Sequence, residues 1–364
     1  MMEIVAWSVF AFLAIQFLVS LANLLWAEKL PVKAKESDVL VSVLIPARNE
    51  EANIAQLLTD LGEQNHPNLE IIVFDDESED QTLTLVYSFV EEDSRFHLIR
   101  SEGLPSGWLG KNNACHQLAQ KAKGKYLLFL DADVRISRDF VGRFLDFTMR
   151  KKLKLASIFP KQIMFSIGEK LSVPLMHFIL LSLLPLMLVR KSKFVSLSAA
   201  NGQCMLFEAA YYHEILPHQL LKAEKVEDIR IAQLYKSHHQ QIACLTGETG
   251  IQCRMYQSFD QAVNGFSKNI RAFFGNSFLL AVFFWLLTTF GACFVLFVLP
   301  LPIGIAGIFF WLLTRIFISA QSRQHIFTNL ISLIPQQISL GWIILKAMLA
   351  NITKSLVWKG RNIS

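Results

Sequence analysis

Residues 126–133 read YLLFLDAD, five mostly apolar residues followed by two aspartates that are one residue apart. An uninterrupted apolar run of this length predicts a strand that is buried on both faces, as in a parallel sheet. The same order occurs twice upstream. Residues 39–45 precede the turn 46–50 (PARNE), and residues 69–74 precede the acidic stretch 75–80 (DDESED).

Helical segments separate these strands. The spacing of Ile54, Leu57, Leu58 and Leu61 predicts a helix over 50–61. Further helices are expected over 81–91 and 112–123, and a short strand over 96–99. Alternating strands and helices predict an α/β fold with a mostly parallel sheet, in which ligands bind at the carboxyl ends of the strands.

Asp131 and Asp133 are the candidate metal ligands. Side chains two apart on a strand point the same way, and paired carboxylates suit Mg²⁺ or Mn²⁺. Such a cation would neutralise the charge that builds on a nucleoside-diphosphate leaving group. An Asp-x-Asp pair is common by chance, so its weight comes from its place after a third buried strand.

Three further groups of residues are candidates for nucleotide binding. Asp75 and Asp76 follow a buried strand, where a carboxylate can accept a hydrogen bond from a base. Ala47 and Glu50 follow the strand over 39–45 and lie at the start of the helix over 50–61. The start of a helix is a natural place for a nucleotide. Lys111, within 107–113 (GWLGKNN), begins a helix and suits phosphate, although the P-loop spacing is missing. Each group alone also fits an ordinary turn or a solvated loop.

Glu227 and Asp228 form an acidic pair much later in the chain. Such a pair is typical of a helix start, but Asp228 is also the candidate base that takes the proton of an acceptor. Arg254, or Lys268 after it, could stabilise a departing phosphate.

Composition indicates a protein that is partly membrane-embedded. Of its 364 residues 52% are hydrophobic and 18% are charged, against about 25% charged in soluble domains. The net charge is +5, but 277–364 contains six basic and no acidic residues, so the rest sums to −1. This distribution is typical of membrane anchoring and excludes a nucleic-acid partner.

Five cysteines without a Cys-x-x-Cys motif predict reduced thiols and neither disulfides nor zinc.

The uncharged runs predict a multi-pass protein of the cell (inner) membrane. Residues 4–26 are long enough to span, and the basic residues that follow place the amino terminus outside. Residues 277–314, divided by Pro300 and Pro302, predict a hairpin of two spans. Residues 326–345 contain Pro335, and a re-entrant or interfacial segment is expected there rather than a span. The predicted domains are therefore an anchor (1–35), a cytoplasmic catalytic domain (36–276) and a carboxyl-terminal membrane segment (277–364).

Residues 171–189 are also uncharged, and hydropathy alone predicts a span. A single crossing there would place Asp228 on the opposite side of the membrane from Asp133. We therefore expect 170–190 to form an interfacial helix pair that lets a lipid approach the site, with a buried core helix as the alternative.

The motifs at 45–50, 75–80, 107–111, 131–133 and 227–228, in this order, resemble those of family 2 inverting glycosyltransferases, which have a GT-A fold. The resemblance covers 36–276. Together with the membrane layout, residues 254–256 (RMY), 265–269 (GFSKN) and 358–361 (WKGR) narrow the likeness and resemble a membrane-bound branch, typified by the bacterial carotenoid-acid (diaponeurosporenoate) glycosyltransferases. The resemblance implies a UDP-sugar donor, with uracil at Asp76, ribose and metal–diphosphate at Asp131 and Asp133, and Asp228 as base.

The expected function is transfer of a sugar from a UDP-sugar, with Mg²⁺ or Mn²⁺, to a lipid-soluble acceptor such as a carotenoid-like molecule. A processive polysaccharide synthase is a rival, but 252–256 (QCRMY) departs from the Gln-x-x-Arg-Trp motif of those enzymes. A non-catalytic membrane protein that binds nucleotide sugars is a second rival. A transporter is disfavoured because the predicted spans contain no carboxylates.

Overall fold

The computed structural model describes residues 1–353, 357–358 and 361–362. The chain forms two compact units that are discontinuous in sequence. The helical unit comprises 1–27, 162–186 and 254–364, and the sheet unit comprises 28–161 and 187–253. The predicted catalytic range 36–276 thus includes two segments, 162–186 and 254–276, that pack within the helical unit. The functional borders at 35 and 276 stay a prediction.

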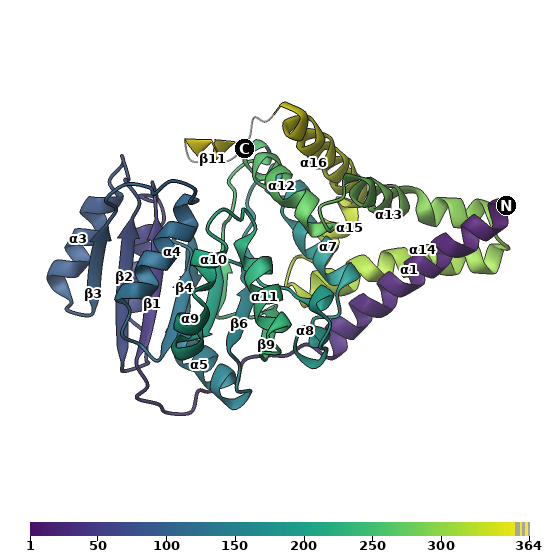
Figure 1. Cartoon of the computed structure of the whole chain (residues 1–364). Coiled ribbons are helices and arrows are strands. Elements are labelled where there is room, and N and C mark those ends of the chain that lie inside the picture. The colour runs from purple at the N-terminus through teal and green to yellow at the C-terminus, as the bar shows by residue number, and fades with distance from the viewer. Residues whose placement is uncertain (354–356, 359–360, 363–364) are drawn as a thin grey trace. The chain divides into compact units, whose positions relative to one another are not determined.

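A seven-stranded sheet organises the sheet unit. Its strands, in spatial order, are β3 (Phe96–Arg100), β2 (Leu69–Asp75), β1 (Val41–Ala47), β4 (Tyr126–Leu130), β8 (Cys204–Glu208), β6 (Leu155–Phe159) and β9 (Ile242–Thr246) (Figure 1). All neighbours pair in parallel except β8, which is antiparallel to both β4 and β6. The predicted mostly parallel α/β sheet is confirmed.

The register of the strands brings their carboxyl ends to one edge. Ala47 at the end of β1 lies opposite Asp75 at the end of β2. Every residue of β2 and β4 is buried, as their apolar runs predicted. The motifs that follow β1, β2 and β4 therefore start from the same edge of the sheet.

Helices connect these strands as expected: α2 (Ile54–Gly62), α3 (Thr82–Glu92), α4 (Gly110–Lys121) and α5 (Phe140–Arg150). In α2, Ile54, Leu57, Leu58 and Leu61 are all buried, which confirms the periodicity. Burying each such side chain contributes about 1.5–3 kcal/mol. The remaining elements of the unit are β5 (Val134–Ile136), α8 (Met187–Lys191), a 3₁₀ turn η1 (Val195–Leu197), α9 (Ala209–Ile215), α10 (Pro217–Leu220), α11 (Glu227–Ser237) and β10 (Ile251–Cys253).

Among its described residues, the helical unit contains four helices that are long and apolar enough to cross a membrane: α1 (Met2–Leu25), α13 (Phe278–Val298), α14 (Leu301–Gln321) and α16 (Leu333–Thr353). The predicted hairpin is present, with its break at Leu299 and Pro300. α1 packs against α13 through small and branched side chains, among them Ala6, Val9 and Ala292. The unit also contains α12 (Phe259–Phe273) and α15 (Ile326–Ile331), and the strands β11 (Val357–Trp358) and β12 (Arg361–Asn362) pair near the carboxyl terminus.

The run 326–345 is divided at Ser332, three residues before the expected break at Pro335. Pro335 is the third residue of α16, where its missing N–H needs no partner inside the helix. α16 therefore continues through both glutamines that follow. Its length and composition suit a span, and the choice between a span and a re-entrant segment stays a prediction. Lys354 and Lys359, two of the six basic residues in 277–364, lie outside the described residues.

The uncharged run 171–189 forms no long helix. It is divided among α6 (Ile167–Ser172), α7 (Pro174–Leu183) and α8. α7 has ten residues, a length of about 15 Å, half of the hydrocarbon core. Seven of these ten residues are buried, and α7 packs against α1 and α14. This packing is what the alternative of a buried helix predicts, and an interfacial position stays a prediction.

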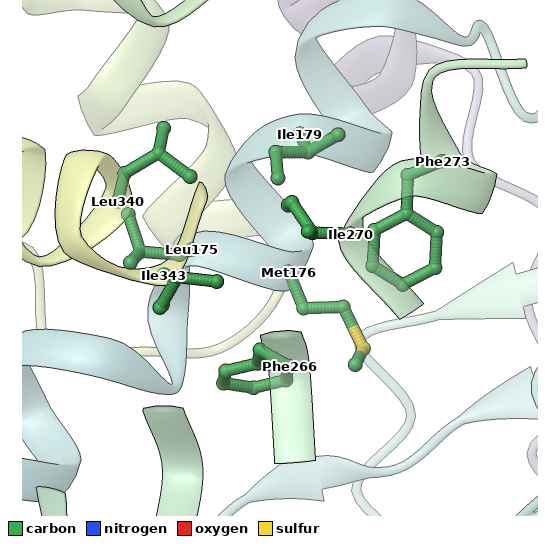
Figure 2. Close-up of a pocket in the computed structure, with 8 residues that line it drawn as sticks. All are labelled: Leu175, Met176, Ile179, Phe266, Ile270, Phe273, Leu340 and Ile343. Atoms are coloured by element: carbon green, nitrogen blue, oxygen red, sulfur yellow. The ribbon is translucent and has the colours of Figure 1, made fainter. Parts of the chain in front are cut away.

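One apolar pocket lies within the helical unit. Its walls come from α7, α12 and α16, and the side chains converge on it in Figure 2. The lining is wholly apolar and consists of Leu175, Met176, Ile179, Phe266, Ile270, Phe273, Leu340 and Ile343.

Candidate active site

The ends of β1 and β2 are joined by hydrogen bonds. The backbone N–H of Asp76 donates to the carbonyl of Ala47 at 2.8 Å, and Arg48 Nη1 donates to the carbonyl of Asp76 at 2.6 Å. Asp75 and Asp76 are both about 95% buried, and Asp75 Oδ1 has no hydrogen-bond partner. The acidic stretch is therefore not a solvated loop, because its first two carboxylates lie inside the protein.

The turns after these two strands form one rigid edge. Asn49 N–H donates to Ser78 Oγ at 3.0 Å, and Asn49 Oδ1 accepts from the N–H of Glu79 at 2.9 Å. Glu50 N–H donates to Thr82 Oγ1 at 2.8 Å. Glu50 and Ala47, two predicted nucleotide-binding residues, therefore lie beside the predicted base-binding Asp75 and Asp76.

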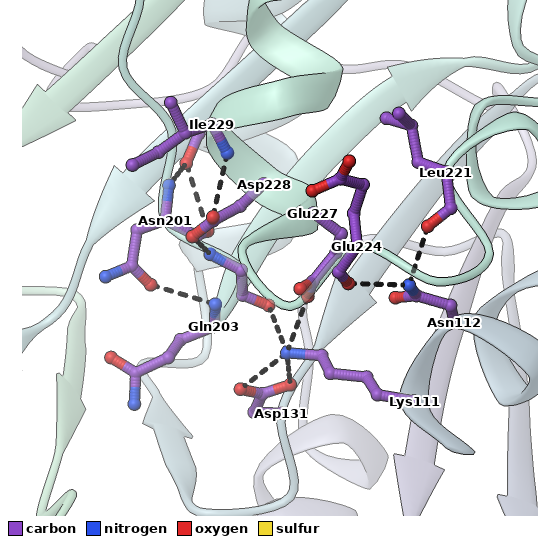
Figure 3. Close-up of polar contacts among 12 residues, drawn as sticks. Lys111, Asn112, Asp131, Asn201, Gln203, Leu221, Glu224, Glu227, Asp228 and Ile229 are labelled. Atoms are coloured by element: carbon purple, nitrogen blue, oxygen red, sulfur yellow. Dashed lines mark hydrogen bonds and ion pairs between the residues drawn. The ribbon is translucent and has the colours of Figure 1, made fainter. Parts of the chain in front are cut away.

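Lys111 is the centre of the second part of the site (Figure 3). It lies in the first turn of α4, and its Nζ is 2.8 Å from Asp131 Oδ1 and 3.5 Å from Glu227 Oε1. It also donates to the carbonyl of Gly202 at 3.3 Å. The sequence separates Lys111, Asp131 and Glu227 widely, and the fold brings all three predicted residues together.

Asp228 lies beside this cluster in the first turn of α11. Its Oδ2 accepts from the N–H of Gly202 at 2.9 Å, and its Oδ1 accepts from the N–H of Ile229 at 2.7 Å. Gly202 thus binds Asp228 through its N–H and Lys111 through its carbonyl. This one residue couples the candidate base to the candidate phosphate-binding lysine.

Asp131 and Asp133 lie in a tight turn between β4 and β5. Val134 N–H donates to the Asp131 carbonyl at 3.2 Å and closes this turn. The two side chains are therefore arranged by a turn, and not by the strand alternation that the sequence suggested. Cys253, which pairs with Val134 in the β5–β10 ladder, hydrogen-bonds to the Asp133 carboxylate through its thiol.

Burial changes the protonation of the acidic groups. Desolvation raises the pKa of Asp133 to about 7, and the charges of Asp131 and Glu50 act in the same direction. Burial also raises the pKa of Asp228, against the two backbone N–H groups that favour its charged form. A raised pKa is typical of a carboxyl group that exchanges protons near neutral pH.

Glu227 and Lys111 each shift the pKa of the other through their opposite charges. Burial raises the pKa of Glu227 to about 7, although the Lys111 charge favours the carboxylate. For Lys111 burial opposes the charge, but Asp131 and Glu227 outweigh it and raise the pKa. Lys111 thus stays a cation in the site and can bind phosphate oxygens.

Arg254 and Lys268 belong to the helical unit. Arg254 Nε and Nη2 donate to Glu169 Oε1 at 3.1 and 2.7 Å, and its guanidinium lies over the ring of Phe165. Burial lowers the pKa of Lys268 to about 8. The contact of either residue with a departing phosphate stays a prediction.

Sequence reasoning missed several residues of the site. Gly202 and Gln203 follow Asn201, and an Asn-Gly pair signals a turn, but no local pattern connects it to carboxylates far away in sequence. Asn112 was overlooked beside Lys111. Its side-chain amide donates to the carbonyls of Leu221 and Glu224, which positions the segment before α11.

The carboxylate oxygens of Asp131 and Asp133 suit a divalent cation. Asp133 Oδ1 is buried without a hydrogen-bond partner, and Asp131 is close enough to raise the pKa of Asp133. Within the described part of the chain no group of three or more His, Cys, Asp or Glu residues could hold a metal. One or two carboxylates completed by water and substrate phosphates are the usual Mg²⁺ arrangement. Asp131 and Asp133 would hold such an ion.

Comparison with known proteins identifies the domain. Residues 42–215, which include β1 to β4, match the model of glycosyl transferase family 2. The chain carries a glycosyltransferase family 2 domain. Of the predicted site, Ala47 to Asp133 lie within this domain, and Glu227 and Asp228 follow it.

Relatives of this family 2 domain include two bacterial proteins. The 4,4'-diaponeurosporenoate glycosyltransferase of Staphylococcus haemolyticus is 25% identical over 244 residues, which is 65% of this chain and 62% of the relative. The protein of that name from Staphylococcus aureus (strain USA300) is 25% identical over 264 residues, 68% of this chain and 65% of the relative. The chain thus matches less than two thirds of the length of either.

The solved mannosyltransferase from Pyrobaculum calidifontis, in complex with GDP-Man and Mn²⁺, has a similar fold. It superposes with a TM-score of 0.58 at 14% identity and covers 96% of this chain and 99% of its own. With the family 2 match, this similarity confirms the predicted GT-A-like fold.

Proposed function

We propose that this chain is a membrane-anchored, inverting glycosyltransferase that moves a sugar from a UDP-sugar to a lipid-soluble acceptor. The observation that carries the proposal is the position of Lys111 between Asp131, after β4, and Glu227, at the start of α11. Lys111, held between these two carboxylates, can bind a diphosphate. The carboxylate of Asp228, which lies beside it, can receive a proton.

The donor would lie along the carboxyl edge of the sheet. Asp75 and Asp76 would contact the base, Ala47 and Glu50 would line the nucleoside, and Lys111 with Asp131 would bind the diphosphate. A divalent cation held by Asp131 and Asp133 would supply positive charge to the leaving diphosphate. The family resemblance favours UDP, whereas the mannosyltransferase of similar fold was solved with GDP-Man, so the base is part of the proposal.

Asp228 would act as general base. An acceptor oxygen attacks the anomeric carbon, its C–O bond forms as the bond to the diphosphate breaks, and Asp228 takes the proton. The hydrogen bonds from Gly202 and Ile229 fix this carboxylate in place. Glu227 would position Lys111, because the two form an ion pair.

A lipid-soluble acceptor fits the helical unit. Four apolar helices suit a multi-pass protein of the inner membrane, with the sheet unit in the cytoplasm, and the pocket of Figure 2 offers only apolar side chains to an acceptor chain. The relatives named as diaponeurosporenoate glycosyltransferases act, by that name, on a carotenoid acid. This supports a carotenoid-like or another lipid acceptor.

Two carboxylate substitutions test the proposal. Membranes that contain the full chain are incubated with a panel of labelled UDP-sugars and a total lipid extract, and products are identified by mass. Asp133→Asn and Asp228→Asn should each lower transfer roughly a hundredfold or more, with the protein still folded in the membrane. Asp93→Asn, which alters an ion pair with Arg95 outside the site, is the matched control and should keep wild-type transfer.

The same assay separates the rival functions. Wild-type turnover in either site variant would contradict the assigned roles. Products of increasing length would indicate a polysaccharide synthase. Binding of UDP-sugar without release of UDP would indicate a non-catalytic binding protein.

A further inference from the structure

Arg315 is a charged residue inside an apolar helix. It lies in α14, one of the four helices that suit a membrane span, and it is 96% buried. Its guanidinium carbon is 3.3 Å from the centre of the Phe178 ring of α7. This stacking offsets part of the cost of burying a charge, but it leaves the N–H groups in the plane of the guanidinium unused.

Two of those groups, Arg315 Nε and Nη2, are buried and have no hydrogen-bond partner. Their N–H bonds run parallel along one edge of the guanidinium, the geometry that a carboxylate or a phosphate accepts with two oxygens. In the described part of the chain, Arg95 with Asp93 and Arg135 with Asp60 use this edge with two carboxylate oxygens. Arg254 uses the same edge, but both of its nitrogens donate to one oxygen, Glu169 Oε1.

The helical unit cannot supply the missing carboxylate. Its sequence contains only three acidic residues, Glu3, Glu169 and Asp260. Glu169 already accepts from Arg254 and from the N–H of Ser166. Glu3 and Asp260 lie in the first turns of α1 and α12, and neither forms an ion pair with Arg315 in the described part of the chain.

The other unpaired groups of these helices are also donors. In the described parts of the four candidate spans, the remaining buried side-chain atoms without a partner are Gln16 Nε2 and Gln337 Nε2. Like Arg315, they lack an acceptor. A buried charge is stable only when it is paired or hydrogen-bonded, and the acceptor that Arg315 lacks would be an oxygen atom that carries negative charge.

The residues around Arg315 indicate which kind of molecule would carry such an oxygen. Arg315 precedes the end of α14 by six residues, or about 9 Å along the helix. At the same end, Asn329 Nδ2 donates to Ser319 Oγ at 2.9 Å and to Gln324 Oε1 at 2.9 Å, so this level of the unit is polar. The remainder of α14, towards its start, is almost wholly apolar. An anion bound at this level with its tail along the helices would be amphiphilic.

We propose that Arg315 binds the oxyanionic headgroup, a carboxylate or a phosphate, of a membrane lipid. The headgroup would accept from Nε and Nη2 with two oxygens while Phe178 holds the guanidinium plane. This site lies within the helical unit and is separate from the candidate catalytic residues of the sheet unit. It does not depend on the proposed sugar transfer.

Native mass spectrometry of the full chain in detergent tests this proposal with ligands that share one tail. The probes are palmitate, hexadecyl phosphate and the uncharged hexadecanol, with inorganic phosphate as the anion without a tail. We expect one palmitate or one hexadecyl phosphate per chain, bound at least about tenfold more tightly than hexadecanol. Arg315→Met should reduce the binding of both anions to the level of hexadecanol.

Arg271 provides the matched control. It also stacks on a phenylalanine, Phe278, but its Nε donates to the Asn276 carbonyl and its Nη1 to Asn351 Oδ1. Arg271→Met should therefore leave anion binding unchanged. Arg315→Lys keeps the charge but loses the paired edge, and we expect binding several-fold weaker than in the wild type.

Three results would overturn the proposal. Hexadecanol could bind as tightly as palmitate, which would show that the tail alone determines the binding affinity. Arg315→Met, or Arg315→Lys if the methionine variant does not fold, could retain wild-type binding of both anions. Inorganic phosphate could bind at Arg315 as tightly as hexadecyl phosphate, which would assign the site to a free anion.

Discussion

Gly202 is the residue on which the geometry of the candidate site depends most directly. A Cβ atom there would lie 3.2 Å from Lys111 Nζ, 3.3 Å from Glu227 Oε1 and 3.6 Å from Asp228 Oδ2. The two closest atoms are ends of flexible side chains, so they would move and the backbone would not. A methyl group at this position would therefore displace Lys111 Nζ and Glu227 Oε1 by a few tenths of an ångström.

Gly202→Ala should lower sugar transfer roughly tenfold to a hundredfold, because displaced catalytic groups cost activity steeply. The thermal unfolding temperature should change little. Gly62→Ala is the control, since its Cβ would meet Phe96 at an ordinary 3.9 Å. Equal activity of the two variants would show that the Lys111 cluster tolerates displacement.

Local sequence was sufficient to find the acidic residues of the site and insufficient to find their partners. Asp76, Asp131 and Asp133 were recognisable because each follows a buried apolar strand. Gly202 and Cys253 were not, because their roles come from hydrogen bonds to residues that are distant in the chain. A pattern within a few residues cannot encode such contacts.

At the scale of elements, one buried lysine links three elements of the sheet unit through hydrogen bonds. Lys236 of α11 is 96% buried, and its Nζ donates to the carbonyls of Leu188 and Leu197 at 3.2 and 2.7 Å. It thereby connects α8, η1 and α11. Burial lowers the pKa of Lys236 from 10.5 to about 8.

This shift predicts a pH dependence of stability. Between pH 8 and 10.5 the unfolded chain holds the Lys236 proton more tightly than the folded chain, so the free energy of unfolding should rise with pH. The wild type should therefore gain unfolding temperature relative to Lys236→Met across this range, as measured in detergent. The exposed Lys125→Met should show no such trend, and a constant difference for Lys236→Met would contradict the shift.

A second prediction at the scale of elements concerns the apolar pocket as the binding place of the acceptor chain. Ile270 of α12 is 98% buried and lines the pocket, so Ile270→Trp should fill it. If the acceptor chain binds there, the KM for the lipid acceptor should rise about tenfold while the KM for the UDP-sugar stays constant. Ile338→Trp places the same side chain on an exposed position of α16 (67% exposed) and serves as control. An unchanged acceptor KM in Ile270→Trp would exclude the pocket as the acceptor site.

For the whole molecule, the sheet unit decides one point of membrane topology. Residues 28–161 and 187–253 form one compact unit in which Lys111 and Asp131 meet Glu227. The segment 162–186 between them must therefore leave and return on the same side of any membrane. Asp133 and Asp228, which the sequence places at one predicted site, both belong to this unit.

Cysteine labelling in right-side-out membrane vesicles tests the topology. In a background where the exposed Cys293 is replaced by serine, Leu183→Cys should react with an impermeant maleimide only after the vesicles are opened. Leu301→Cys, at the first residue of α14, should react from outside. Both side chains lie at the protein surface, 41% and 66% exposed, and reaction of position 183 after opening shows that its thiol is accessible. Labelling of position 183 from outside would contradict the cytoplasmic assignment.

The sequence by itself determined the alternation of strands and helices, the hairpin of α13 and α14 and the acidic residues after β1, β2 and β4. These features depend on periodicity, chain length and proline, which act within a few residues. Only the tertiary structure decided that Lys111 joins Asp131 to Glu227, that α7 packs as a short buried helix and that Arg315 lies unpaired over Phe178. Each of these depends on which distant segments pack together, and packing energy is shared among side chains that no local pattern connects.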